Sequence, residues 1–349
     1  MKSLFHVTVI VILASVAHAC TSSTGGSNSG SMTGQADGLL FPAAPADPVV
    51  EWVASYAKRS DVDPRHHKLR RVLVGEEERE PALLAPTAVA ISPDNTLFVV
   101  DQELRGVVLI NAEKKRFDIF QGTARAPLAE PIGVAVAEDG TLYVSDARSR
   151  AVYSYDLELR LRAVLGSPEV FVRPTGLALS ADGGRLAVCD TRGHMVYVLD
   201  TRDGSTIFEL GANEPGSRAG EFNFPVAAAF DEQGYLYVAD LLNFRIQVFD
   251  GAGDLDMTFG QVGDRPGDLN RPRGLAADSI NGLVYEVDAA FQLVQMFNLD
   301  GELLMWFGSP GTGPAQFSLP TGIGRRGDML AVADTLNHRV QVFRFLGAP

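Results

Sequence analysis

Short apolar runs recur along the chain from about residue 85 to the C-terminal end, and polar segments separate them. The clearest example is Leu319–Phe343, in which apolar runs follow Pro320 and occupy Met329–Ala333 and Arg339–Phe343. The polar segment Asp334–His338 lies between the last two runs and is typical of turns that join antiparallel strands. The pattern therefore predicts a succession of short antiparallel strands.

The same arrangement is repeated, and the second predicted strand of each copy ends in an aspartate. These aspartates are Asp101, Asp146, Asp190, Asp240, Asp288 and Asp334, spaced by roughly 44 to 50 residues. A repeat of this length with four short strands is typical of a propeller blade. We expect an all-β, six-bladed propeller of four-stranded antiparallel blades, with repeats at about 82–122, 129–166, 173–211, 221–260, 269–308 and 317–346.

The first and second strands of each repeat differ in composition. The first strands are rich in glycine and alanine, as in Gly133–Ala137, which suits strands crowded around a propeller axis. The second strands, such as Leu236–Asp240, are apolar on both faces, which indicates burial between neighbouring blades.

The last repeat stops after its third strand, so its fourth strand must come from elsewhere. Two N-terminal segments have the required composition, Val49–Tyr56 and Leu69–Gly75. The first has the stronger strand composition. We therefore expect Val49–Tyr56 to close the ring, with residues 65–75 as a short helix or an accessory strand.

The N-terminus has the features of an export signal. Lys2 is followed by the apolar run Leu4–Ala17 and by a small residue, Ala19, at a cleavage position. Residues 1–19 are thus a predicted signal peptide. The serine- and glycine-rich segment 20–48 is a predicted flexible tether, and 49–349 the propeller.

Cys20 directly follows the predicted cleavage position, and this arrangement resembles a bacterial lipoprotein signal, in which that cysteine is lipidated. The resemblance implies an anchor in the bacterial cell envelope, at the outer membrane or the periplasmic face. Ordinary cleavage before an incidental cysteine is the alternative and implies a secreted protein. The other cysteine, Cys189, lies in an apolar strand and is expected to be buried.

Net charge argues against one class of partner. The formal charge is −13, whereas nonspecific nucleic-acid binding requires a basic footprint. Nucleic acid is therefore an improbable partner.

The turn after the second strand carries a recognisable motif in two repeats. It includes Asp240, Asn243 and Arg245 in one copy and Asp334, Asn337 and Arg339 in another. With the Pro-Thr-Gly or Pro-Arg-Gly starts and Phe-Gly ends, these copies resemble the NHL repeat, and the resemblance implies a six-bladed propeller. Because the aspartate recurs in every copy, we interpret the motif as structural: the carboxylate accepts hydrogen bonds from the turn, and the arginine pairs with it.

Some propellers that resemble NHL proteins are enzymes, including lactonases and a peptide-amidating lyase, and they use metal ligands at the channel. Here only His194 and His338 lie within the repeats, and no HExxH, GxSxG or P-loop motif occurs. The sequence therefore predicts no catalytic residue, metal or cofactor. An envelope lyase or lactonase-like enzyme with a channel metal remains an alternative function.

Arginines near the expected starts of inner strands form a candidate binding face at one mouth of the channel. They are Arg173, Arg271, Arg273 and Arg325, with Arg265 and Arg326 beside them. We expect an interaction or scaffold module that binds an envelope protein through this face. A carbohydrate-binding propeller is the second alternative.

Overall fold

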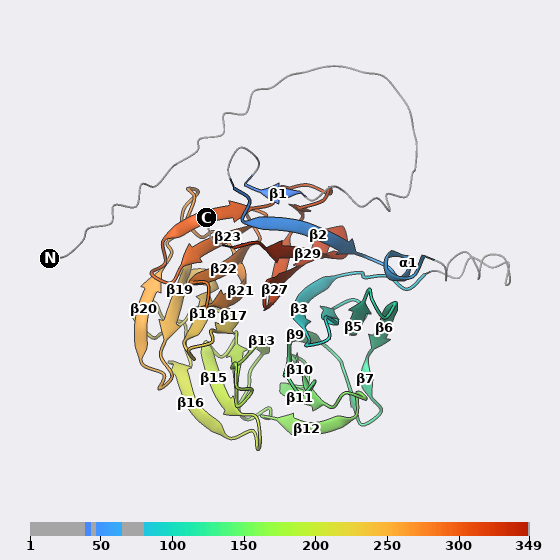
Figure 1. Cartoon of the computed structure of the whole chain (residues 1–349). Helices are drawn as coiled ribbons and strands as arrows, with labels where there is room; N and C mark the ends of the chain where they lie inside the picture. The colour runs from blue at the N-terminus through green and yellow to red at the C-terminus, as the bar shows by residue number, and fades with distance from the viewer. Residues whose placement is uncertain (1–38, 43–46, 65–79, 348–349) are drawn as a thin grey trace. The chain divides into compact units, whose positions relative to one another are not determined.

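A computed structural model describes residues 39–42, 47–64 and 80–347. Within these residues, six sheets of at least four antiparallel strands surround a central axis (Figure 1). Inner strands of successive blades lie side by side around the ring, in the order β3, β9, β13, β17, β21 and β27. This arrangement confirms the predicted six-bladed propeller.

In each of the first three blades, the four strands lie in chain order from the axis outward. Blade 1 contains β3 (Pro86–Ile91), β4 (Leu97–Asp101), β5 (Gly106–Asn111) and β6 (Arg116–Phe120). Blade 2 contains β9 (Pro131–Val136), β10 (Leu142–Asp146), β11 (Ala151–Tyr155) and β12 (Leu161–Leu165). Blade 3 contains β13 (Pro174–Leu179), β14 (Arg185–Asp190), β15 (Met195–Asp200) and β16 (Thr206–Gly211).

Blades 4 and 5 repeat this order, and blade 6 takes its outer strand from the N-terminus. Blade 4 contains β17 (Pro225–Phe230), β18 (Leu236–Asp240), β19 (Arg245–Phe249) and β20 (Leu255–Phe259). Blade 5 contains β21 (Pro272–Asp278), β22 (Leu283–Asp288), β23 (Leu293–Asn298) and β24 (Leu303–Phe307). Blade 6 contains β27 (Pro320–Arg326), β28 (Met329–Asp334), β29 (Arg339–Phe345), β2 (Val50–Tyr56) and β1 (Leu40–Phe41).

Small elements complete the described part of the chain. Two short strand pairs lie in connections between blades: β7 (Gly122–Thr123) with β8 (Ala126–Pro127), and β25 (Ser309–Pro310) with β26 (Gln316–Phe317). A single helical turn, α1 (Arg59–Val62), follows β2, and two 3-10 turns, η1 (Leu241–Asn243) and η2 (Thr335–Asn337), follow the second strands of blades 4 and 6.

The N-terminal strand closes the ring, as predicted. β2 pairs antiparallel with β29, from Val50 opposite Phe345 to Tyr56 opposite Val340. The indole Nε1 of Trp52 also donates to Gln341 Oε1 at 2.9 Å. The alternative segment Leu69–Gly75 lies outside the described residues. β1, from the range expected to be a tether, adds a fifth strand to this sheet.

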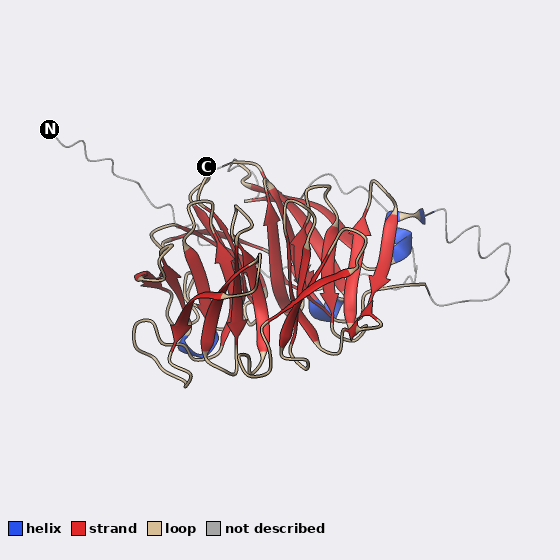
Figure 2. Ribbon diagram, turned by 90° about the horizontal axis from the view of Figure 1, so that it is seen from below, coloured by secondary structure: helices blue, strands red, loops and turns tan. Residues whose placement is uncertain are grey.

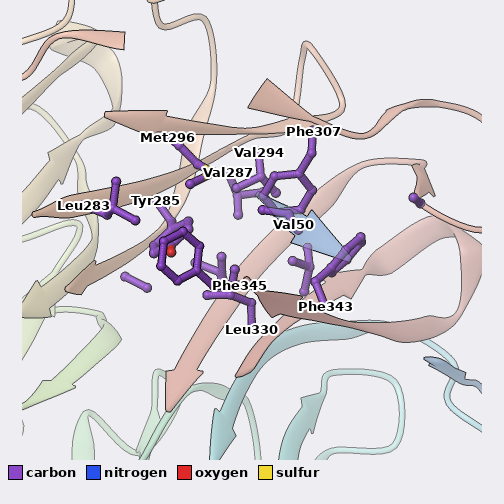
Figure 3. Packing of buried hydrophobic residues seen from close by; sticks show 14 of the residues in the cluster. Val50, Leu283, Tyr285, Val287, Val294, Met296, Phe307, Leu330, Phe343 and Phe345 are labelled. Carbon is purple, nitrogen blue, oxygen red and sulfur yellow. The ribbon is translucent and has the colours of Figure 1, made fainter. Parts of the chain in front are cut away.

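The hydrophobic core consists of separate layers between adjacent blades. The layer between blades 5 and 6 includes Tyr285, Phe307 and Phe343, all at most 1% exposed (Figure 3). The ring centroids of Phe307 and Phe343 are 4.9 Å apart. The second strands are buried along their length, as their two-sided apolar pattern predicted.

Close approach of the inner strands explains their glycines. A Cβ on Gly133 would stand 2.2 Å from the Thr175 backbone oxygen in the next blade. One on Gly176 would stand 2.5 Å from the Val226 backbone oxygen. Larger residues at these positions would force the blades apart.

Candidate functional site

A channel runs along the propeller axis and opens into a cavity at each end. The first residues of all six inner strands line the cavity at one end and their last residues line the cavity at the other, so these strands run in the same direction. Figure 1 shows the ring along its axis and Figure 2 shows it turned by 90°. We call these openings the start mouth and the end mouth. The start-mouth cavity has a volume of about 380 Å³ and the end-mouth cavity about 780 Å³.

An apolar ring separates the two cavities. It contains one mid-strand residue from each blade: Val89, Val134, Leu177, Ala228, Leu275 and Ile323. We call this ring the waist. Because its side chains are apolar, a polar ligand has favourable contacts at either mouth but not at the waist.

The start mouth is surrounded by the residue that follows the first proline of each inner strand. This collar consists of Thr87, Ile132, Thr175, Val226, Arg273 and Thr321. Arg273 is its single charged member. The hydroxyls of Thr175 and Thr321 are occupied, since Thr175 bonds Thr191 at 2.5 Å and Thr321 donates to the Thr87 backbone oxygen at 2.9 Å.

Two buried polar groups in this cavity have no partner among the described residues. They are the Nε of Arg273 and the Oγ1 of Thr87. Arg273 also forms no salt bridge there. Burial of the guanidinium, together with the nearby charge of Arg271, lowers the pKa of Arg273, but an arginine still keeps its charge in a protein.

The other arginines expected at this mouth are arranged differently. Arg173 lines the cavity, but its Nη2 lies 2.7 Å from Glu130 Oε1 in blade 2, so its charge is paired. Arg271 is exposed, and its backbone N–H donates to Asp288 Oδ2 at 2.9 Å. Arg265 is exposed in the preceding loop. The structure thus brings Arg173 and Arg273 together and leaves Arg271 beside them.

Arg325 and Arg326 lie at the opposite mouth, contrary to the expectation of one face. They are the last residues of β27, so the length of that strand carries them to its far end. Arg326 forms two hydrogen bonds of 2.7 Å with the Glu138 carboxylate of blade 2. This pair lowers the pKa of Glu138.

Arg325 is also held by acidic groups of other blades. Its Nη1 lies 3.2 Å from Asp278 Oδ2, and its Nη2 contacts Glu232 of blade 4. The two arginines therefore tie blade 6 to blades 2, 4 and 5 around the end mouth. Neither is free to bind an anion without breaking these pairs.

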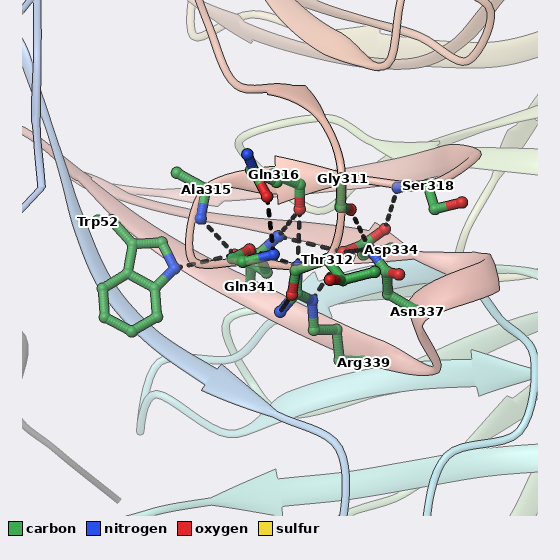
Figure 4. A network of polar contacts seen from close by, with 11 residues as sticks. Trp52, Gly311, Thr312, Ala315, Gln316, Ser318, Asp334, Asn337, Arg339 and Gln341 are labelled. Atoms are coloured by element: carbon green, nitrogen blue, oxygen red, sulfur yellow. Dashed lines mark hydrogen bonds and ion pairs between the residues drawn. The ribbon is translucent and has the colours of Figure 1, made fainter. Parts of the chain in front are cut away.

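The turn motif of blade 6 forms a closed network (Figure 4). The buried Asp334 carboxylate accepts from the Asn337 Nδ2 at 2.8 Å and from the Arg339 Nε at 2.7 Å. The remaining Arg339 nitrogens donate to the backbone oxygens of Thr312, Gly313 and Gln316 in the loop before β27.

Blade 4 has the same arrangement. Asp240 accepts from Asn243 at 2.7 Å and from Arg245 Nε at 2.9 Å. Arg245 in turn donates to three backbone oxygens of the loop between Ser217 and Glu221. In both blades the polar groups satisfy one another and the loop backbone, so they hold the fold together.

The other four blades use the aspartate without the asparagine and arginine. Asp101, for example, accepts from the backbone N–H groups of Leu84, Ala85 and Leu104 at 2.7–3.0 Å. The turn amide thus takes the place of the side-chain donors. Because backbone N–H groups can replace the side-chain donors, the repeats without the asparagine and arginine still keep the aspartate.

Sequence reasoning missed the buried glutamines on the third strands of blades 4, 5 and 6. Gln247, Gln295 and Gln341 each accept from a backbone N–H and donate to a backbone oxygen of the preceding long loop. The signal was present, because the three glutamines occupy the same position in the aligned repeats. They share this loop-holding role with Arg245 and Arg339.

Other expected groups lie away from the channel or outside the described residues. Cys189 is fully buried, and burial raises the pKa of its thiol. His194 accepts from the Phe224 backbone N–H at 3.3 Å, and His338 contacts the Leu84 backbone oxygen. Cys20 lies outside the described residues.

In residues 39–42, 47–64 and 80–347, no group of three or more His, Cys, Asp or Glu side chains is arranged to hold a metal ion. No helix in the same ranges has the length and hydrophobicity needed to cross a membrane.

Comparisons with known proteins identify the fold. Neither a protein-family model nor a curated protein sequence matches the chain. A streptogramin B lyase structure aligns with a TM-score of 0.57 and 14% identity over 75% of this chain and 94% of that chain. A structural genomics protein of unknown function from Bacteroides thetaiotaomicron aligns with a TM-score of 0.58 and 16% identity over 76% of this chain and 70% of that chain.

A third similar structure is Kuenenia stuttgartiensis hydrazine synthase, with a TM-score of 0.54 and 16% identity over 79% of this chain and 99% of that chain. These identities establish a common fold and leave the activity open, because one propeller architecture serves many functions. The chain is a six-bladed β-propeller similar in fold to these proteins.

Proposed function

We propose that this chain is an exported, lipid-anchored binding module of the bacterial cell envelope, and that it docks a protein partner on its start-mouth face. The observation that carries the proposal is the combination of free arginines and exposed aliphatic side chains on this face. The buried cores of interfaces are more apolar than the rest of the protein surface, and interfaces are enriched in arginine but depleted of lysine, glutamate and aspartate.

The arginines of this face project from turns around the start mouth. Arg148 and Arg192 follow the aspartates of blades 2 and 3, and Arg265 and Arg271 precede blade 5. All four are exposed and form no salt bridge with another described residue. They offer charge for an acidic partner surface.

Exposed aliphatic side chains lie in the same set of turns. Leu242 is 46% exposed, Leu336 58% and Val262 64%. The first two are the tips of η1 and η2, where the network around each aspartate fixes the backbone. A rigid surface loses little conformational entropy on binding, which favours affinity.

The end-mouth face has a different charge. Its turns carry many exposed acids, including Asp139, Asp182, Asp203, Asp254 and Asp300. The start-mouth turns also carry exposed acids, among them Glu103, Glu169, Glu214 and Asp264, but these are interspersed with the exposed arginines. An acidic partner would be repelled by the end-mouth face and steered to the start-mouth face.

Proximity crosslinking in the native envelope, followed by mass spectrometry, tests the docking. The double variant Arg192→Glu, Arg271→Glu should lower recovery of the dominant partner by about tenfold or more, because like charges across an interface cost several kcal/mol. The matched control, Arg160→Glu with Arg202→Glu, changes the same charge on the end-mouth face and should leave recovery unchanged. Recovery of no dominant protein by the unmodified chain would refute the proposal.

The anchor is tested separately. We expect the Cys20→Ala variant to leave the membrane fraction and to lose partition into detergent, because acyl chains on Cys20 would supply the membrane affinity. Detergent partition that is unchanged in this variant would contradict lipidation.

A further inference from the structure

We propose that the start-mouth cavity is a binding socket for one small oxyanion, a carboxylate or a phosphate, with the Arg273 guanidinium as its principal ligand. This claim concerns groups inside the cavity, whereas partner docking concerns the exposed face around it, and it covers an oxyanion that is free or carried by a partner protein.

The position of Arg273 in its repeat gives the first argument. In the aligned repeats the same collar position holds threonine, isoleucine or valine, so the fold does not require a cation there. Arg273 nevertheless is half-buried, has no salt bridge among the described residues, and its Nε lies buried without a hydrogen-bond partner. The guanidinium is therefore partly removed from water without a counter-charge, which costs free energy, so an anionic ligand is the natural complement.

The surrounding groups give the second argument. The Thr87 Oγ1 is buried without a partner in the same cavity, and Gln102 contributes a further polar side chain. A guanidinium binds a carboxylate or phosphate through two parallel hydrogen bonds, and a hydroxyl can donate a third. The apolar waist beneath, with Val89 and Leu275, favours an anionic group near the opening rather than a fully charged molecule inside the channel.

Charge pairing limits the number of anions. Arg173 faces the same cavity, but Glu130 already holds it at 2.7 Å. Among the described residues that line the cavity, one cation is left without a counter-charge, so the expected stoichiometry is one singly or doubly charged group per chain. A metal cation is disfavoured by the same unpaired charge.

The socket can be tested with sodium phosphate and sodium succinate on the purified protein, using calorimetry and thermal melting, with sodium chloride at equal ionic strength as the reference. We expect saturable binding of one anion per chain and a rise in melting temperature beyond that produced by chloride. Arg273→Thr should weaken binding at least about tenfold, the loss expected when a charged hydrogen-bond partner is removed. Threonine already occupies this collar position in three blades, so the variant should fold.

Two further variants separate the socket from general charge effects. Arg202→Thr makes the same charge change on the exposed end-mouth face and should alter the affinity by less than about threefold, as expected for a distant, screened surface charge. Thr87→Val keeps the shape, removes the unpartnered hydroxyl and should weaken binding by a smaller factor than Arg273→Thr.

The outcomes distinguish the source of the anion. Binding of phosphate or succinate that Arg273→Thr abolishes supports a free ligand, even if no partner protein is ever recovered. If neither free anion binds but Arg273→Thr loses the crosslinked partner, the group is an acidic side chain of that partner. Equal responses to chloride and both oxyanions, with partner recovery unchanged in Arg273→Thr, would overturn the socket.

Discussion

Replacing Glu286 with valine should stabilise the folded protein at neutral pH. Glu286 lies on β22 and is 0% exposed. It occupies the position that holds a fully buried valine in the other five blades, namely Val99, Val144, Val188, Val238 and Val332. Its Oε1 has no hydrogen-bond partner among the described residues, and Oε2 accepts only from Gln295 at 3.3 Å.

The expected gain in folding stability has two sources, the missing hydrogen bond of Glu286 and the proton that its buried carboxyl retains. A buried polar atom without a partner costs about 1–3 kcal/mol. Burial also raises the pKa of Glu286 well above its usual range, and the nearby Asp288 adds to the effect. The folded protein therefore retains a proton that the unfolded chain releases above pH 4.5. Stability then falls by about 1.4 kcal/mol for each pH unit between the unfolded and folded pKa values.

Both the hydrogen-bond cost and the pH dependence can be measured by urea denaturation from pH 4 upward. The unmodified protein is compared with the Glu286→Val and Glu286→Gln variants. The valine variant should be about 1–3 kcal/mol more stable at pH 4, where the carboxyl is protonated in both states. This advantage should grow toward neutral pH, because both variants lose the stability decrease that begins near pH 4.5. Glu209→Gln, an exposed substitution on β16, is the control and should change neither quantity. A valine variant that is less stable than the unmodified protein at pH 7, or an unchanged pH dependence in both Glu286 variants, would refute this reasoning.

Two further predictions concern contacts between and within blades. Arg339→Ala should cost about 3 kcal/mol or more, because it leaves the fully buried Asp334 carboxylate without its counter-charge. Arg202→Ala removes one partner of a solvent-exposed pair and should leave the melting temperature nearly unchanged. Thermal melting of both variants checks this difference, and equal losses would contradict it. Gly133→Ala should cost about 1–3 kcal/mol, because the new Cβ would meet a backbone oxygen that cannot turn away. Gly184→Ala, with no neighbour closer than 3.5 Å, should be nearly neutral by the same measurement.

Much of the fold follows from the sequence because it depends on local patterns that repeat. The apolar runs, the turn after each aspartate and the glycines of the inner strands are each readable within one repeat. Even ring closure was predictable, since the last repeat lacks its fourth strand and Val49–Tyr56 has the composition to supply it. Repeats whose faces cannot be buried alone must stack, so the number of copies determines the architecture.

The candidate site depended on the tertiary structure. Arg273 and Arg325 both lie near an inner strand in the sequence, so the sequence analysis placed them at the same mouth. In the structure they lie at opposite ends of their strands and therefore at opposite mouths. When the repeats are aligned, Glu286 and Arg273 are charged where the other five repeats have uncharged residues. Only the packing shows that Glu286 is wholly buried and that Arg273 is unpaired among the described residues.

Contacts between distant repeats decide which charges remain available. Arg326 is neutralised by Glu138, which lies 188 positions away in sequence, and Arg173 by Glu130 in the preceding blade. Sequence by itself determined the strands, their number and the closed ring, because those follow from local periodicity and from the need to bury each blade's faces. Only the tertiary structure decided where a free charge remains, because electrostatic pairing depends on distances in space that ring closure creates.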